Sequence, residues 1–139
     1  MAVSTQRFTL STKGETDIID ITGRVADRIK ESGLRSGTAT VFVSGSTGGV
    51  TTVEYESGLI EDLQRAFEGL APRTAHYAHD ARWGDGNGYA HVRASLLGPS
   101  LAVPFSDGDL LLGTWQQIIL IDFDNRARRR EVIVQVVGE

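Results

Sequence analysis

The spacing of hydrophobic and polar positions predicts a chain built mainly of short strands. Alternation over residues 7–11 and β-branched runs at 17–21, 38–44 and 50–54 predict strands in the first half. The last third has the same character. It predicts strands at 100–105, 110–115, 116–123 and 132–137.

Between these strands the spacing becomes helical. An apolar stripe over residues 18–29 predicts a helix that stops at Gly33. A second stripe over 59–70 predicts a longer helix, with Ser57 as its cap and Pro72 just after its end. Each helix has one apolar face, so each is expected to pack against the sheet.

The order of these elements predicts one α+β domain over residues 1–139, with a largely antiparallel sheet and about three helices on one side. The third helix is expected at 89–97, ending at Gly98. The Gly/Ser/Thr segment 45–49 separates two predicted strands, which indicates a hairpin or a sharp bend.

Composition narrows the class of protein. The chain has no cysteine, which excludes disulfides, thiolate metal sites and cysteine nucleophiles. The formal net charge of −4 argues against nucleic acid as a partner. The N-terminus lacks an apolar signal core and no stretch is long enough to cross a bilayer, so we expect a cytoplasmic protein with no membrane partner.

One basic run, Arg126–Arg130, departs from this acidic balance. A solvated turn or strand end explains it better than a nucleic-acid patch, because such a patch needs a wider basic face. A narrower role stays open, in which one or two of these arginines contact a phosphorylated ligand.

All three histidines lie between residues 76 and 95, in a segment expected to be a long loop followed by the third helix. Asp80, Asp85 and Asn87 lie among them, with glycines interleaved. Imidazoles and carboxylates in this arrangement can bind a metal or transfer protons, although the spacing of His79 and His91 matches no standard zinc motif. A hydrogen-bonded structural cluster is the alternative.

Three further positions carry candidate chemistry, each with a plainer alternative. Glu54 is an acid, base or metal ligand, or else an exposed charge at a strand end. The amides of residues 45–49 are an anion-binding nest or a simple turn. Trp115 and Gln116 line a pocket, or else Trp115 is a core or subunit contact, which the sequence favours.

Several motifs together resemble those of the YjbQ-like family, whose members are described as secondary thiamine-phosphate synthases. The resemblance covers nearly the whole chain. It is carried by Thr51-Thr-Val-Glu54, Tyr77-x-His79, Asp85-x-Asn87, Ala90-His91, Ser95-Leu-Leu-Gly98 and Leu112-Gly-Thr-Trp-Gln116.

The resemblance implies a compact α+β fold, a homotrimer with a site near subunit boundaries, and a divalent metal, zinc or magnesium. It also implies a weak activity that joins two phosphorylated precursors of thiamine phosphate. Carried over by motif, the metal ligands are His79 and His91, and the ligand-binding triplet is Gly45, Ser46 and Thr47. The catalytic positions carried over in the same way are Glu54, Asp85, Asn87 and Gln116.

One position departs from the family pattern. The usual His-Thr-Thr or His-Thr-Ser triplet reads Gly45-Ser46-Thr47, so a third histidine ligand is absent there. His76, Glu54 or Asp85 would replace it, or else no metal binds. Three functions follow as hypotheses: a thiamine-phosphate synthase-type transferase, a non-catalytic oligomeric protein that binds a small ligand, or a metal-dependent hydrolase.

Overall fold

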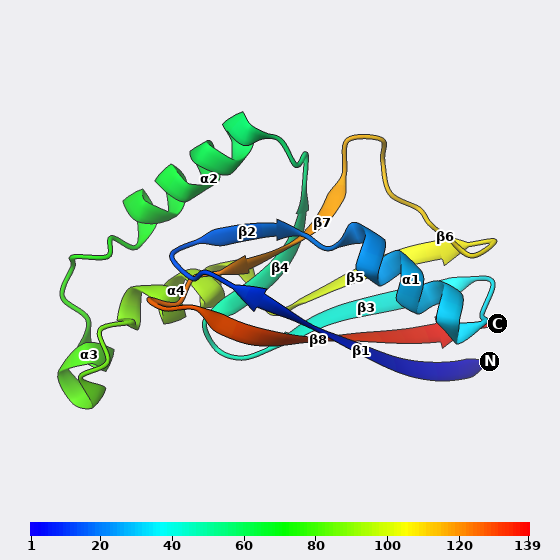
Figure 1. Ribbon diagram of the computed structural model, residues 1–139, viewed down its shortest axis with the longest axis horizontal. Helices are drawn as coiled ribbons and strands as arrows, with labels where there is room; N and C mark the ends of the chain where they lie inside the picture. The colour runs from blue at the N-terminus through cyan, green and yellow to red at the C-terminus, as the bar shows by residue number, and fades with distance from the viewer.

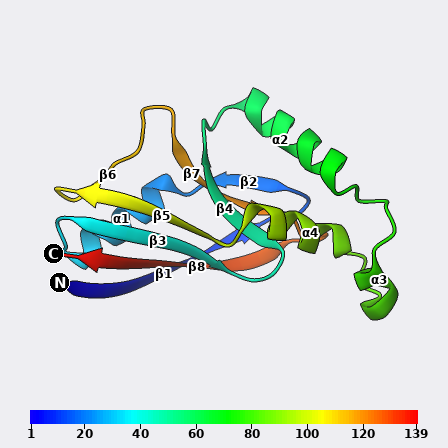
Figure 2. The same ribbon diagram turned by 180° about the vertical axis from the view of Figure 1, so that it is seen from behind.

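Two antiparallel sheets and four helices make up the computed structural model, which describes residues 1–139 (Figures 1 and 2). The α+β class and the single domain are therefore confirmed. No helix is both long enough and apolar enough to span a membrane. The strands are β1 (Ala2–Thr12), β2 (Asp17–Asp20), β3 (Gly37–Ser44), β4 (Gly48–Val53), β5 (Ser100–Ser106), β6 (Asp109–Leu110), β7 (Gln117–Asp122) and β8 (Arg128–Gly138). The helices are α1 (Thr22–Ser32), α2 (Ser57–Leu70), α3 (Ala78–Trp83) and α4 (Gly88–Leu97).

The strands pair across long stretches of sequence. The larger sheet has the order β1-β8-β3-β5-β6 and the smaller one has the order β2-β7-β4. Consecutive strands β3 and β4 lie in different sheets, so the chain bends sharply between Ser44 and Gly48 and does not form a hairpin. This bend leads from one sheet to the other beside the C-terminal half of α4 (Figure 2).

The apolar run of β7 explains how the layers are held together. Ile118 and Leu120 point into a cluster shared with the larger sheet and α1, whereas Ile119 and Ile121 point into a second cluster with α2 and α4. All four side chains are fully buried because β7 is covered on both faces. A strand covered on both faces reads as a continuous hydrophobic run, which is what the sequence has here.

The three longer helices, α1, α2 and α4, agree with the predicted number, but their arrangement differs from the prediction. α1 packs in the cluster between the sheets, while α2 and α4 pack on the other face of the smaller sheet, so the helices do not share one side. Residues 78–83, expected as loop, form the short helix α3. The cap of α2 is Glu56, whose carboxylate accepts hydrogen bonds from the amides of Gly58 and Leu59, and Ser57 is the first helical residue.

The predicted strand at 110–115 is also largely wrong. Only Asp109 and Leu110 pair with β5, and residues 111–116 form a loop that leads to β7. Trp115 lies in this loop with 73% of its surface exposed, which excludes it from the core.

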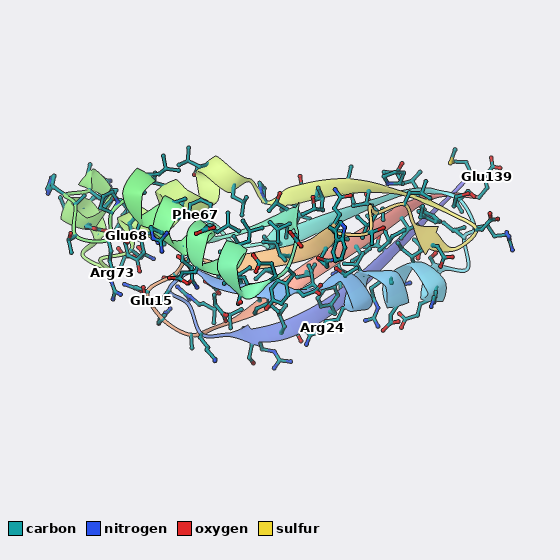
Figure 3. The ribbon with its side chains drawn as sticks, turned by 90° about the horizontal axis from the view of Figure 1, so that it is seen from above. Glu15, Arg24, Phe67, Glu68, Arg73 and Glu139 are labelled. Atoms are coloured by element: carbon teal, nitrogen blue, oxygen red, sulfur yellow. The ribbon has the colours of Figure 1, made fainter.

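A buried arginine, Arg93, fixes α4 against the end of α2. The Arg93 guanidinium donates to the Ala71 carbonyl oxygen at 2.9–3.0 Å, to Thr16 Oγ1 at 2.9 Å and to Glu68 Oε2 at 2.5 Å. Figure 3 shows Glu68 beside Arg73 and Glu15, the latter two joined by an ion pair of 2.9 Å. These contacts hold α4 against the end of α2 and so position the first turn of α4.

Candidate functional site

Two of the three histidines come together where α3 meets α4. His79 lies on α3 and His91 lies on the first turn of α4, with their ring centroids 4.3 Å apart. The intervening turn needs positive φ at Gly84 and Gly86, which glycine adopts without steric cost. Gly88 also allows close contact, because a Cβ there would lie 2.6 Å from Cβ of Tyr77.

Two carboxylates face His79. The Nδ1 atom of His79 lies 3.6 Å from an oxygen of Asp80 and 3.6 Å from an oxygen of Asp85. One possible ligand atom from each of these three residues lies within 4.8 Å of the other two. These separations exceed hydrogen-bond distance, and His79 Nδ1 is buried without a hydrogen-bond partner. A buried nitrogen between two carboxylates has the arrangement expected of a cation ligand.

The surroundings of His91 favour its neutral form. Burial, and then the charge of the adjacent His79, lower the pKa of His91 below its ordinary value, against the opposite pull of Asp124, Asp85 and Asp80. A neutral imidazole can accept a proton or bind a metal, which a protonated one cannot.

Asn87 adds a second unpaired polar atom. Its Nδ2 donates to Asp124 Oδ1 at 3.3 Å, which fixes the amide orientation because a carboxylate only accepts. The opposite atom, Asn87 Oδ1, is buried and unpaired. Burial would raise the pKa of Asp124, but hydrogen bonds from the Asn125 amide, Asn87, Arg128 and Thr47 outweigh it and hold that pKa below its usual value.

Behind Asn87 lies a buried polar network. Arg130 pairs with Asp122 through Nε at 2.8 Å and Nη2 at 2.9 Å, and its Nη2 also donates to Thr47 Oγ1 at 2.6 Å. Thr47 in turn donates to Asp124 Oδ2 at 3.0 Å. The predicted triplet residue Thr47 therefore connects Arg130 to the carboxylate that holds Asn87.

This network corrects the interpretation of the basic run as a solvated turn or strand end for two of its arginines, whereas Arg126 and Arg129 are exposed as that interpretation expects. Arg130 is buried and Arg128 is half-buried, with Arg128 pairing with Asp124 at 2.7 Å. The sequence signal for the burial of Arg130 is the strand alternation, since Arg130 shares its face of β8 with the buried residues Val132, Val134 and Val136. Asp80 lies in the histidine segment, but the sequence pattern alone assigns it no separate role, because it does not predict the helix α3 that turns Asp80 toward His79.

Gly45 and Ser46 lie exposed at the bend beside this network. Gly45 has φ +135°, and a Cβ at this position would lie 2.6 Å from Arg130 Nη1. The Arg130 guanidinium thus occupies the space in front of residue 45, so a histidine side chain here would require Arg130 to move.

Three other candidates lie elsewhere in the chain. Glu54 and Gln116 are exposed at the far end of β4. With a rise of about 3.3 Å per residue, this end lies roughly 20 Å along the strand from Thr47. Gln116 donates to Thr52 Oγ1 at 3.0 Å and accepts from the Gly113 amide. His76 is exposed before α3. Within one chain, only Asp85 of the proposed replacement ligands lies beside His79.

The structure has two pockets. The larger, about 450 Å³, lies between the chain termini and contains none of the candidate residues. The smaller, about 170 Å³, lies between the β3–β4 bend and α4. It is lined by Gly45, Ser46, Gly48, Ala94, Ser95 and Pro99.

Comparisons with known proteins agree over nearly the full length. A family model described as UPF0047 protein YjbQ-like matches residues 6–139. A UPF0047 protein of Methanothermobacter thermautotrophicus is 40% identical over 139 residues, covering 100% of this chain and 95% of that protein. A UPF0047 protein of Archaeoglobus fulgidus is 41% identical over 126 residues, covering 91% of this chain and 96% of that protein.

Solved structures share the fold. A YbjQ-like protein of unknown function from Sulfolobus solfataricus P2 has a TM-score of 0.94 at 30% identity, covering 99% of each chain. A hypothetical protein from Aeropyrum pernix K1 has a TM-score of 0.91 at 31% identity, covering 98% of this chain and 99% of that one. The family read from the sequence motifs is confirmed: the chain belongs to the UPF0047, YjbQ-like family.

Proposed function

We propose that this protein is a metal-dependent enzyme acting on a small phosphorylated substrate, with a thiamine-phosphate synthase-type transfer as the specific reaction. The observation that carries the proposal is the buried, unpaired Nδ1 of His79 facing Asp80 and Asp85. A purely structural histidine would be expected to donate or accept a hydrogen bond at a buried nitrogen.

The donor set fits a divalent cation. His79, Asp80 and Asp85 would hold it, with His91 beside them and Asn87 Oδ1 available as a neutral oxygen. Mixed imidazole and carboxylate donors suit zinc, and the oxygen-rich side of the set suits magnesium. When bound, such an ion supplies positive charge that neutralises a pyrophosphate leaving group.

In this reaction the thiazole nitrogen attacks the methylene carbon of the pyrimidine diphosphate, and the carbon–oxygen bond to pyrophosphate breaks. The chain's own part is to position the two substrates and exclude water. This step transfers no proton, so the neutral His91 would serve as a hydrogen-bond partner for the substrate, while Asp124 keeps the Asn87 amide oriented.

A second candidate function is a non-catalytic small-ligand-binding protein. It is favoured by the position of Glu54 and Gln116, which lie far from the histidine pair within one chain. In the homotrimer that we propose, a neighbouring subunit can bring such residues to the site, as the family resemblance implies.

Pyrophosphate release separates the two functions. We expect slow release from the paired pyrimidine and thiazole precursors with zinc or magnesium, and at least a hundredfold less from His79→Ala, because second-shell changes alone commonly cost 10- to 100-fold. Glu61→Gln, an exposed substitution on α2, is the matched control and should keep full activity. Absence of release by the wild type with either metal would reject the transferase and leave the binding protein.

A further inference from the structure

One nitrogen of the buried Arg130 has no partner in the protein. Its Nε and Nη2 are fixed by Asp122 and Thr47, while Nη1 takes part in no hydrogen bond. Although the Arg130 side chain is only 7% exposed, Nη1 does not belong to the unpaired polar atoms that are fully shielded from solvent. Arg130 therefore presents a single rigid, charged donor at the end of the β3–β4 bend.

Two glycines leave that donor uncovered. An added Cβ at Gly45 would lie 2.6 Å from Nη1, and one at Gly48 would lie 3.7 Å from the central guanidinium carbon. Both glycines line the pocket of about 170 Å³ between the bend and α4. The pocket therefore adjoins a cationic donor that a larger residue at position 45 would block.

Three backbone amides without partners lie in the same bend. The amides of Gly45, Ser46 and Thr47 donate to no backbone acceptor, since they lie outside both strands and form none of the turn hydrogen bonds. Ser46, whose hydroxyl has no hydrogen bond within the protein, also lines the pocket. Consecutive free amides beside an arginine form the kind of nest that binds oxyanions.

The pocket also adjoins the candidate metal site. Ser95 follows His91 by one turn of α4, and its Oγ donates to the His91 carbonyl oxygen at 2.8 Å. A ligand whose phosphate occupied the pocket would extend toward His91 over about 6 Å, the rise of four helical residues.

We propose that the pocket is an oxyanion subsite that binds a phosphate group through Arg130 Nη1 and the amides of residues 45–47. This deepens the proposed function, because it places the phosphate of the phosphorylated substrate. It does not depend on the metal, since none of its donors belongs to the histidine and aspartate cluster. Gly45 then has a role of its own, which is to leave Arg130 open to the ligand.

Amide NMR of the chelator-treated wild-type protein, titrated with inorganic phosphate at constant ionic strength, tests this directly. We expect saturable shifts of the Gly45, Ser46 and Thr47 amide signals. Phosphate-induced shifts that avoid these three amides, or that appear only after metal is restored, would overturn the subsite while leaving the metal site intact. Saturable shifts in a protein that binds no metal would support the subsite and reject the proposed enzyme.

A pair of glycine substitutions adds a second measurement. Gly45→Ala should weaken phosphate binding at least about tenfold, because it blocks a charge-assisted hydrogen bond. Gly33→Ala is the control, since Gly33 also has positive φ but an added Cβ there meets nothing within 4 Å. Equal phosphate affinity in a folded Gly45→Ala variant would contradict the proposal, and the wild-type titration stands as the test if that variant fails to fold.

Discussion

Single side chains of the site are held by contacts that lie outside it. Asn87 is fixed by Asp124, and the main-chain oxygen of Asp85 accepts from Asn125 Nδ2 at 2.9 Å. Asp80 accepts from the Gly88 amide at 2.8 Å, which joins α3 to the start of α4. These hydrogen bonds fix the side chains of Asn87 and Asp80 and the backbone of Asp85 before any ligand arrives.

Tyr89 gives a prediction at this scale. Burial, followed by its hydrogen bond to Glu15, raises the pKa of Tyr89 to about 12. In the unfolded chain Tyr89 ionises near pH 10. The stability that the neutral, buried Tyr89 provides below that pH is therefore lost as the pH rises toward 12. We expect the free energy of unfolding to fall by roughly 2 kcal/mol between pH 9 and 11.5 through this residue.

Urea unfolding of the wild type and Tyr89→Phe at both pH values measures this loss. Lysines and exposed tyrosines contribute equally to the two proteins, so the difference between them isolates Tyr89. Wild type should be more stable than Tyr89→Phe at pH 9, by about 1 kcal/mol for the lost hydrogen bond, and less stable than the variant by about 1 kcal/mol at pH 11.5. An advantage that is unchanged by pH would contradict the assigned pKa.

At the scale of elements, periodicity predicts most strands and the two amphipathic helices α1 and α2. The periodicity also contains the signal for the buried arginine Arg130. The alternation of β8 extends back to Arg128, which puts Arg130 on the buried face, but a run of arginines hides this pattern when charge is taken to mean exposure. The acids Asp122 and Asp124 that make its burial possible follow directly after the apolar run of β7.

Other elements could not be predicted from local sequence. α3 has only six residues, none of them buried, and is held by contacts to α4 rather than by an apolar stripe. The division into two sheets depends on pairing between distant strands, such as β1 with β8. On α4 the buried face contains Tyr89, Arg93 and Ala94, whereas Val92 is exposed, so the hydrophobic pattern alone identifies the wrong face.

At the scale of the whole molecule, exposed apolar side chains at the β6–β7 loop support the proposed trimer. Leu111 and Trp115 have 58% and 73% of their surfaces exposed. Gln116 and Glu54, the candidates that lie apart from the histidines, are near this loop, since Gln116 donates to Thr52. An interface formed by this loop would bury the tryptophan and bring both polar residues to a subunit boundary.

Trp115→Ala tests the interface. Loss of a buried interface tryptophan typically costs 2 kcal/mol or more, so we expect about a thirtyfold weaker association, measured by light scattering on a size-exclusion column over a range of concentrations. Val3→Ala, at an exposed apolar residue on β1, is the control and should leave the oligomer unchanged. A monomeric wild type, or a Trp115→Ala variant that assembles normally, would contradict this assignment.

The most direct test of the whole account is the divalent metal content of the untagged protein after zinc or magnesium is added and the excess removed. We predict about one ion per chain in the wild type, strong loss in His79→Ala and Asp85→Asn, and full retention in Asp62→Asn, an exposed acid on α2 that changes the charge equally. A wild type that retains no metal, or an Asp85→Asn variant that retains as much as the wild type, would contradict the assignment of His79, Asp80 and Asp85 as the metal site.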